Sequence, residues 1–288
     1  MDLKQKMELA YDTKIDNFGN KIEFSYPNET VAISTTNSEC FLKCAHCNGH
    51  YLKNMTPIND YENKIKSKNV SSFLISGGCN FDGDVPINKH IDTLKKLKEE
   101  GYKLNAHLGL MDEESINKVC KYLDIVSFDL VFDKDTIKEV YKIDKNAQDY
   151  ITAYETIKQN TEVAPHICIG LKGGEIKGEY EVIEYLSNNP PKKITFIVLI
   201  PTKNTEYEKV SPPDLNKVAD VLCSARISLP NTEINLGCMR PRGEYRSELD
   251  KIALMCGVNK IVLPSRSAKN KAIEMDMNIT EGKECCVL

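Results

Sequence analysis

The chain has 288 residues, enough for a sizeable core, and this length fits either one barrel or two ordinary domains. Hydrophobic residues make up 41% and charged residues 28%, close to the globular average, which excludes a mostly disordered or fibrous protein. The formal net charge is −4, from 38 basic and 42 acidic residues, and it disfavours nucleic acid as a partner.

The chain carries no segment typical of a membrane span. Its longest apolar run, at 194–200, is far shorter than the roughly 20 residues that cross a bilayer, so we expect no membrane partner. Residues 1–16 lack the apolar core of a secretory signal, and we expect a cytoplasmic protein. The 11 cysteines are then expected to be metal ligands, reactive thiols or core residues rather than disulfides.

Short apolar and β-branched runs alternate with helix-like segments. No repeat or low-complexity linker divides the chain, so we expect one domain over residues 1–288. The runs predicted to be strands are 30–34, 70–75, 103–108, 124–130, 163–169, 194–200, 233–236 and 260–263.

Helices are predicted between these strands. Apolar residues at helical spacing over 87–97 end at Gly101, and Ser211 with Pro212 is predicted to be the N-cap and first turn of a later helix. Eight strand–helix units favour an α/β fold, a full or nearly full (β/α)8 TIM-type barrel, with its core at about 30–265 and short terminal extensions. A doubly wound open sheet is the alternative.

Three closely spaced cysteines follow the first of these strands. Cys40, Cys44 and Cys47 have the spacing C-x3-C-x2-C, which lets three thiolates bind three irons of a [4Fe–4S] cluster and leaves the fourth iron without a protein ligand. A zinc knuckle completed by His46 or His50 is the alternative, which a place after strand one of a barrel disfavours.

This spacing after the first strand of a barrel resembles that of the radical S-adenosylmethionine (SAM) enzymes. The resemblance implies that Cys40, Cys44 and Cys47 hold the catalytic [4Fe–4S] cluster and that SAM chelates its open iron. One electron then cleaves SAM to a 5′-deoxyadenosyl radical, which removes hydrogen from an unactivated C–H bond. A ferredoxin or flavodoxin is the implied electron donor.

Further positions match this family after later strands. Gly77 and Gly78 resemble the glycine-rich turn that binds the methionine amino group, where small residues let the backbone approach a ligand. Asp129 matches a position that holds the ribose hydroxyls in biotin-synthase-like members, with a surface loop aspartate as the alternative. Gly170 begins a stretch resembling the adenine support. Arg240 is a candidate partner of the SAM carboxylate, or else an ordinary surface arginine.

The later part of the chain is similar to biotin synthase. The similarity involves residues 196–205 and 237–243, and the matches together cover about 30–265. In biotin synthase an auxiliary cluster inside the barrel donates sulfur, but here His107 stands where that family presents a cysteine ligand, so biotin formation is not expected. His107 and His166 could each line the cavity, or each could be an ordinary histidine packed in the core.

Four other cysteines are candidate ligands of a second, auxiliary iron–sulfur cluster. This hypothesis requires the tail, 266–288, to fold over the catalytic mouth of the barrel. A disordered tail and a C-a-a-X prenylation signal are the alternatives. Cys120, Cys223 and Cys256 are expected to pack in helices, and Cys168 is left open. The four candidate ligands are Cys79, Cys238, Cys285 and Cys286.

Within the biotin-synthase-like branch, these motifs and the Cys-Cys terminus most resemble the archaeal-type two-protein lipoyl synthases. The resemblance implies a radical SAM sulfurtransferase that inserts sulfur from a consumed auxiliary cluster into an octanoyl chain on a carrier protein. A second radical SAM component is the implied partner. The alternatives are a mutase, isomerase or maturase resembling methylornithine synthase, and a non-enzymatic metal-binding structural module.

Overall fold

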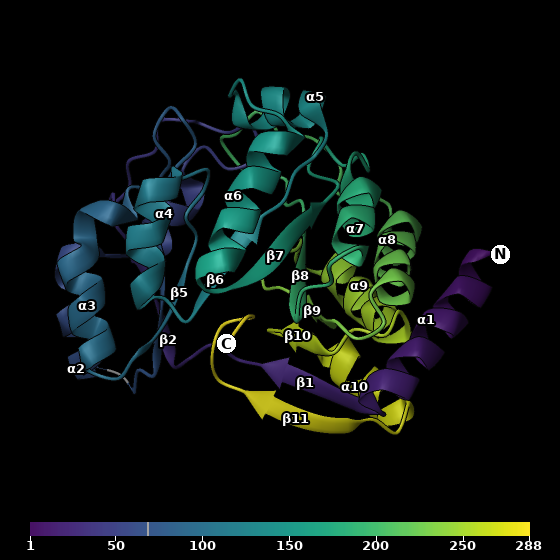
Figure 1. Cartoon of the computed structure of the whole chain (residues 1–288). Coiled ribbons are helices and arrows are strands. Elements are labelled where there is room, and N and C mark those ends of the chain that lie inside the picture. Colours follow the sequence, from purple (N-terminus) through teal and green to yellow (C-terminus); the bar gives the residue numbers. More distant parts are fainter. Residues whose placement is uncertain (68) are drawn as a thin grey trace.

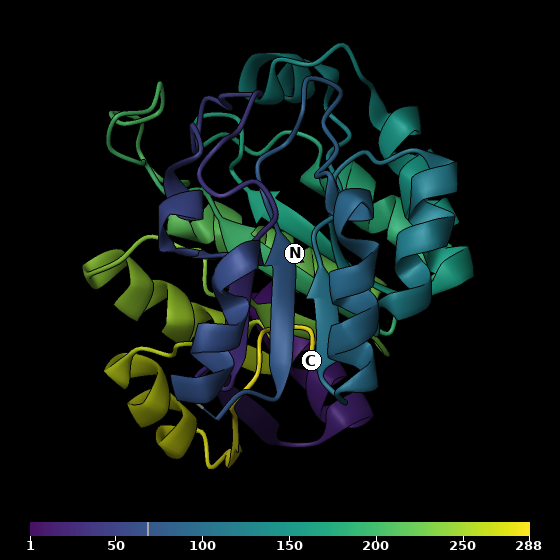
Figure 2. The same ribbon diagram turned by 90° about the vertical axis from the view of Figure 1, so that its left-hand side faces the viewer.

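The computed structural model describes residues 1–67 and 69–288, and its strands form one parallel sheet. Within the described residues the strand order is β11-β1-β10-β9-β8-β7-β6-β5-β4-β2-β3. The sheet is curled, and helices cover its outer side (Figures 1 and 2). The strands are β1 (Lys21–Ser25), β2 (Thr30–Ser34), β3 (Thr56–Pro57), β4 (Ser72–Ser76), β5 (Lys103–Ala106), β6 (Ile125–Asp129), β7 (Glu162–Ile169), β8 (Lys193–Val198), β9 (Glu233–Leu236), β10 (Lys260–Val262) and β11 (Asn278–Gly282).

Each of the eight strands predicted from the sequence is confirmed, with ends that shift by a few residues. They lie in chain order across the sheet, as in a TIM-type barrel, but the ring does not close as in the expected (β/α)8 fold. In the described chain β10 pairs with β1 instead of β2, and β11 pairs with β1. The terminal extensions thus supply two strands of a more open barrel.

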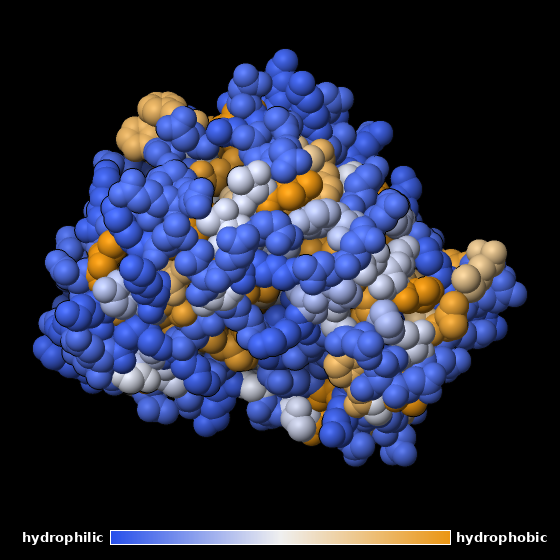
Figure 3. All heavy atoms as spheres, viewed as in Figure 1, coloured by the Kyte–Doolittle hydropathy of each residue, from blue (hydrophilic) through white to orange (hydrophobic). Residues whose placement is uncertain are grey.

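The helices pack their apolar faces on the sheet and present polar faces outward. Leu94 and Leu97, for example, are fully buried on α3. The face seen in Figure 3 is accordingly mostly hydrophilic, with scattered apolar side chains. No helix among residues 1–67 and 69–288 has the length and apolarity needed to span a membrane. The α-helices are α1 (Leu3–Phe18), α2 (Tyr61–Ser67), α3 (Ile91–Glu99), α4 (Glu113–Val119), α5 (Lys134–Thr136), α6 (Ala147–Asn160), α7 (Glu179–Ser187), α8 (Leu215–Ser228), α9 (Glu244–Met255) and α10 (Arg266–Glu274).

The start of α8 differs from the expectation. The helix begins at Leu215, and its N-cap is Asp214, whose Oδ1 accepts hydrogen bonds from the backbone N–H groups of Asn216 and Lys217. Ser211 and Pro212 each precede a proline, which disfavours the helical conformation at both, so the expected cap at Ser211 was wrong.

Helix α1 was not predicted. Asp2 and Gln5 form a capping box at its first turn, and the helix packs against α8. Gly257, just after α9, lets α1 approach closely, because a Cβ at this position would lie 2.8 Å from the Ala10 carbonyl oxygen. The N-terminal extension is therefore part of the helical layer.

Candidate active site

A cavity of about 370 Å³ opens at the carboxyl ends of the central strands. Loops that follow β2, β4 and β6 supply several of its walls, which is where a parallel barrel places functional groups. The predicted site residues that line it are Cys40, Cys44, Cys47, Gly77, Gly78, Cys79, His107, Asp129 and Cys168.

The loop that follows β2 brings Cys40, Cys44 and Cys47 to this cavity. Cys44 is buried and the other two are half-buried. The loop folds back on itself through hydrogen bonds from the Cys47 N–H and the Asn48 N–H to the Cys44 carbonyl oxygen, at 3.2 and 2.9 Å. A hydrogen bond between the Cys44 and Cys47 thiols is the main cause that raises the pKa of Cys44 and lowers that of Cys47.

The glycine turn after β4 packs directly on this cysteine loop. A Cβ at Gly78 would lie 1.9 Å from the Glu39 carbonyl oxygen and 2.6 Å from Cys40 Cα, so only glycine fits. The Gly78 N–H donates to Thr36 Oγ1 at 2.7 Å, so this donor is already engaged within the protein. Gly78 thus determines where the cysteine loop lies.

Cys79 belongs to the same cavity. Its carbonyl oxygen accepts the Phe41 N–H at 2.9 Å. Burial raises the pKa of its thiol to about 12, with smaller contributions from the charges of Cys40, Cys47 and Asp129. The structure therefore groups Cys79 with the first three cysteines and Asp129.

Asp129 ends β6 and reaches the cavity. Its carboxylate accepts no hydrogen bond from any described residue, so both oxygens are available to a ligand. Asp129 is solvent-exposed at the cavity, but the protein around it displaces water and so raises its pKa, while His166 and His46 act in the opposite direction. A carboxylate acceptor at this place is suited to bind hydroxyl groups.

Gly170 lies at the end of β7 behind the cavity wall. It has φ of 73°, and a Cβ there would meet the Pro213 ring at 2.8 Å. Its N–H donates to Glu179 Oε1 at 2.7 Å. The glycine therefore shapes the turn, and the next residue, Leu171, lines the cavity.

Arg240 lies elsewhere than expected. It is fully buried, and its guanidinium pairs with Asp250 through Nε at 2.7 Å and Nη2 at 3.1 Å. The remaining donors bind the carbonyl oxygens of Gly237, Val262 and Leu263. Since all five N–H groups are used inside the protein, the expected contact with the SAM carboxylate is wrong, and Arg240 is a structural residue.

Several cavity residues had no signal in the sequence. Tyr141 ends a π-helical turn, Ile137–Tyr141, and its ring lies edge-on to His46 with centroids 5.8 Å apart. The neighbouring Val140 carbonyl oxygen accepts the Ala45 N–H at 2.8 Å, which ties this turn to the cysteine loop. Tyr51 and Tyr150 also line the cavity. Aromatic residues at helical positions look like core residues in a single sequence.

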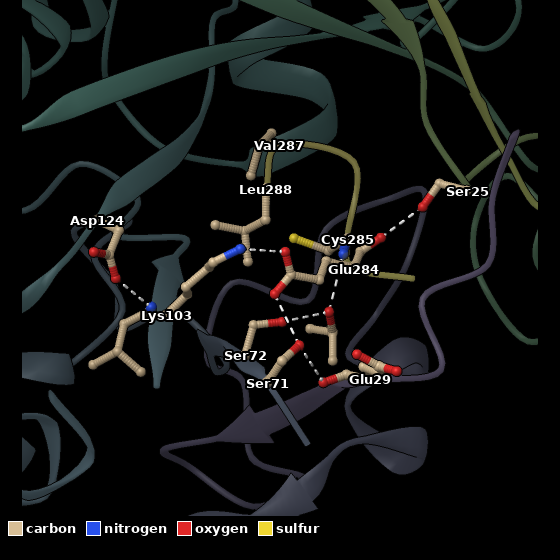
Figure 4. A network of polar contacts seen from close by, with 12 residues as sticks. Ser25, Glu29, Ser71, Ser72, Lys103, Asp124, Glu284, Cys285, Val287 and Leu288 are labelled. Atoms are coloured by element: carbon tan, nitrogen blue, oxygen red, sulfur yellow. Dashed lines mark hydrogen bonds and ion pairs between the residues drawn. The ribbon is translucent and has the colours of Figure 1, made fainter. Parts of the chain in front are cut away.

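The C-terminal strap, residues 283–288, lies at the opposite end of the barrel. Figure 4 shows Glu284 held by Ser71 and Lys103, and the two contacts are 2.8 and 2.7 Å long. The Cys285 N–H donates to Thr30 Oγ1 at 2.9 Å. Ser71, Thr30 and Lys103 lie at or just before the amino ends of their strands. The expectation that the tail covers the catalytic mouth was therefore wrong, and so was its disordered alternative.

The remaining cysteines divide into two groups. Cys120, Cys223 and Cys256 are buried in the helical layer, as expected. Cys238 follows β9, whereas Cys285 and Cys286 lie on the strap, where Cys286 Sγ is 3.7 Å from His166 Nε2. The proposed set of four auxiliary ligands is therefore split, because Cys79 lies in the active-site cavity.

The donor set of the cavity fits an iron–sulfur cluster. In the part of the chain that the structure describes, no three His, Cys, Asp or Glu side chains converge on a position for a single metal ion. A [4Fe–4S] cluster has a different requirement, because each thiolate binds a different iron. Three thiols on one loop, lining a cavity with an unpartnered carboxylate, meet that requirement and leave space for an organic ligand.

Comparison with known proteins supports one class. No protein-family model matches the chain. The chain is 28% identical over 182 residues to the biotin synthase of Prochlorococcus marinus, which covers 61% of this chain and 52% of that enzyme. It is 21% identical over 272 residues to the biotin synthase of Pseudoalteromonas translucida, with 87% and 77% covered. The chain thus spans about half the length of the first of these relatives.

Solved structures share the fold. Methylornithine synthase superposes with a TM-score of 0.67 and 16% identity, over 96% of this chain and 89% of that one. Streptococcus suis SuiB bound to S-adenosylmethionine superposes with a TM-score of 0.53 and 14% identity, over 89% and 61%. These likenesses show the fold. The cysteine loop and the sequence similarity to biotin synthases support a radical SAM enzyme as the class of this protein. Within that class, the sequence relatives support the biotin-synthase-like branch.

Proposed function

We propose that this protein is a radical SAM sulfurtransferase, one component of a two-protein lipoyl synthase acting on an octanoylated carrier protein. The main observation in support of radical chemistry is that the cysteine loop, the glycine turn and Asp129 line the same cavity. Their assembly at the carboxyl ends of β2, β4 and β6 supports a shared ligand with an amino acid part and a ribose part.

Different residues of the cavity bind the cluster and SAM. Cys40, Cys44 and Cys47 hold the [4Fe–4S] cluster, and Gly78 fixes their loop against β4. Asp129 accepts hydrogen bonds from the ribose hydroxyls of SAM. When bound, the reduced cluster supplies the electron that divides SAM into methionine and a 5′-deoxyadenosyl radical. Tyr141, Tyr150 and Leu171 form cavity walls that help keep water from the reacting carbon.

Sulfur insertion requires a sulfide donor in addition to the radical site. For each C–H bond converted, one SAM and one electron yield methionine, 5′-deoxyadenosine and a substrate carbon radical. A second iron–sulfur cluster, if bound, would supply the sulfide that bonds to this carbon and would take up the one remaining electron. The candidate thiols for holding such a donor include Cys238 after β9 and Cys286, whose Sγ lies 3.7 Å from His166 Nε2. A ferredoxin or flavodoxin is the proposed reductant, and a second radical SAM protein the proposed partner.

The test uses the anaerobically reconstituted full chain with dithionite. We expect 5′-deoxyadenosine in stoichiometric amount from SAM, and its loss when Cys40, Cys44 and Cys47 are replaced by alanine. Its absence with an intact, reduced cluster would contradict radical chemistry and favour a metal-binding structural module. An octanoyl-lysine peptide, incubated with the partner component present, should gain the mass of one or two sulfur atoms. An unchanged mass would contradict the lipoyl synthase proposal.

A second candidate is a rearrangement enzyme without sulfur insertion. The observation that favours it is the superposition on methylornithine synthase over 96% of this chain. This alternative needs only the cluster of the cysteine loop. It predicts one four-iron cluster per chain and radical formation without sulfur in the product.

A further inference from the structure

A fourth thiol lines the active-site cavity beside the three of the cysteine loop. Cys79 belongs to a different element, the loop that follows β4, and it lines the same cavity as Cys40, Cys44 and Cys47. It is half-buried, as Cys40 and Cys47 are. The proposed function uses only the three thiols of the cysteine loop. Cys79 is therefore a metal-binding side chain at the radical site without an assigned role.

Backbone contacts hold Cys79 against the cysteine loop. Its carbonyl oxygen accepts the Phe41 N–H at 2.9 Å. A Cβ on the preceding residue, Gly78, would lie 2.7 Å from Cys40 Cβ, so the two loops are in direct contact at the first ligand of the cluster. Consecutive Cα atoms are about 3.8 Å apart, so the Cys79 side chain begins one residue away from this contact.

The Cys79 thiol has no hydrogen-bond partner within the part of the chain that the structure describes. Other thiols of the protein do have one. Cys256 Sγ donates to the Ala219 carbonyl oxygen at 3.6 Å, and Cys285 Sγ accepts from Asn105 Nδ2 at 3.5 Å. The Cys79 sulfur is therefore available to a ligand in the cavity.

The order of strands explains why Cys79, and not another thiol, meets the cysteine loop. Strand β4 pairs directly with β2, with Ser76 opposite Ser34 at the ends of the two strands. The loops that follow these strands therefore start side by side. Cys168 also lines the cavity, but it lies on β7, which β5 and β6 separate from β4. Cys168 thus enters the cavity from a different wall.

We propose that Cys79 is a displaceable fourth ligand of the [4Fe–4S] cluster, which binds the open iron until SAM replaces it. Four cysteine thiolates are the ordinary ligand set of such a cluster, and four thiols on two touching loops line this cavity. The proposal rests on the proposed function, because it requires the cluster and SAM. In the exchange, the bond from Cys79 Sγ to iron breaks, the SAM amino and carboxylate groups bind that iron, and the thiolate takes up a proton. No electron is transferred.

The exchange has two measurable consequences. SAM binds only to the fraction of chains in which Cys79 has left the iron, so the thiol lowers the apparent affinity for SAM. Oxidation of a three-cysteine cluster releases the iron that lacks a protein ligand and leaves a [3Fe–4S] cluster. A thiolate on that iron keeps it in place, so Cys79 should protect the cluster before SAM binds.

The first test measures this protection. Full-length wild type, Cys79→Ala and the matched control Cys168→Ala are reconstituted anaerobically without SAM, oxidised with ferricyanide and examined by electron paramagnetic resonance. We expect a [3Fe–4S] signal several times larger in Cys79→Ala than in wild type and Cys168→Ala. Iron and sulfide analysis before oxidation and circular dichroism check for equal cluster content and folding. Equal signals in wild type and Cys79→Ala would overturn the proposal.

Cys79→Ser is the second variant, for use where Cys79→Ala does not fold or hold the cluster. It keeps the size of the side chain but replaces the thiolate by a much weaker iron ligand. The [3Fe–4S] signal should again exceed that of wild type. A signal equal to that of wild type would count against the role of Cys79.

The second test measures SAM binding by anaerobic calorimetry on the same samples. We expect about tenfold tighter binding in Cys79→Ala, which corresponds to Cys79 occupying the iron in about nine chains of ten, and no change in Cys168→Ala. Equal or weaker binding in Cys79→Ala would overturn the exchange.

Formation of 5′-deoxyadenosine with dithionite separates this proposal from the proposed function. If wild type forms it and Cys79→Ala matches wild type in both tests, the role of Cys79 fails while the radical chemistry stands. If none forms although Cys79 protects the cluster, the proposed function fails and the fourth ligand stands.

Discussion

The two ends of the barrel are built differently. The carboxyl end is open, and its cavity is walled by irregular loops that hold four thiols and an unpartnered carboxylate. The amino end is closed by a strap whose carbonyl oxygens are bound by lysine, asparagine and serine side chains. One end is arranged to admit a ligand, and the other to keep solvent out.

The difference shows how one sheet serves two purposes. At the carboxyl ends, Gly78 lets loops approach closely without regular pairing. At the amino ends, strand-end side chains replace the missing ladder and satisfy the strap's backbone groups. The two ends are therefore expected to respond differently to substitution, and four predictions test this, in order of decreasing effect.

Of the four substitutions, Arg240→Met should have the largest effect, and this effect should be on the stability of the fold. Removing one partner of the fully buried Arg240–Asp250 pair leaves an uncompensated charge, and we expect the free energy of unfolding to fall by about 3–5 kcal/mol. Thermal denaturation measures this. The control is Arg242→Met, which replaces an exposed residue nearby and should change the free energy of unfolding little. A weaker SAM affinity with unchanged stability would show instead that Arg240 binds the ligand.

Gly78→Ala should damage the open end without unfolding the protein. The added Cβ collides with Glu39 and Cys40 backbone atoms, so the cysteine loop must move. A displacement of this kind lowers the rate of 5′-deoxyadenosine formation by about a hundredfold. The control is Gly101→Ala, whose Cβ meets no atom within 4 Å but whose φ of 87° is strained. Equal rates in both variants would contradict the role given to Gly78.

Asp129→Asn should weaken SAM binding. The amide keeps the shape of the side chain but loses the charged acceptor, which is worth about 1.5–3 kcal/mol, or a factor of about ten to a hundred in Kd. Anaerobic calorimetry with the reconstituted protein measures it. The exposed Asp144→Asn serves as the matched control. An unchanged affinity in Asp129→Asn would remove this residue from the ligand site.

Lys103→Met should have the smallest effect, at the closed end. Its ion pair with Glu284 is partly exposed, so we expect a stability loss below about 1 kcal/mol. Exchange of the strap's amide hydrogens should become slightly faster, while the formation of 5′-deoxyadenosine stays at the wild-type rate. A large loss of radical formation would mean that the two ends are not independent.

Local patterns in the sequence were enough for the elements that carry the site. Apolar runs predict the eight central strands because parallel strands are buried on both faces, and that signal is local. The spacing of Cys40, Cys44 and Cys47 lies within one loop, so its chemistry is visible without the fold. The two strands in the terminal extensions were missed because β1 pairs with β11 and β10, and these are contacts between distant parts of the chain.

The sequence by itself therefore determined the alternating strand–helix order, the cysteine loop and the class of chemistry that this loop supports. Tertiary structure decided which residues meet. It placed Arg240 in a buried ion pair, placed Cys79 in the active-site cavity, and took the strap to the amino end of the barrel. The physical reason is that spacing along a chain encodes local conformation, whereas the partner of a buried charge or thiol depends on long-range packing.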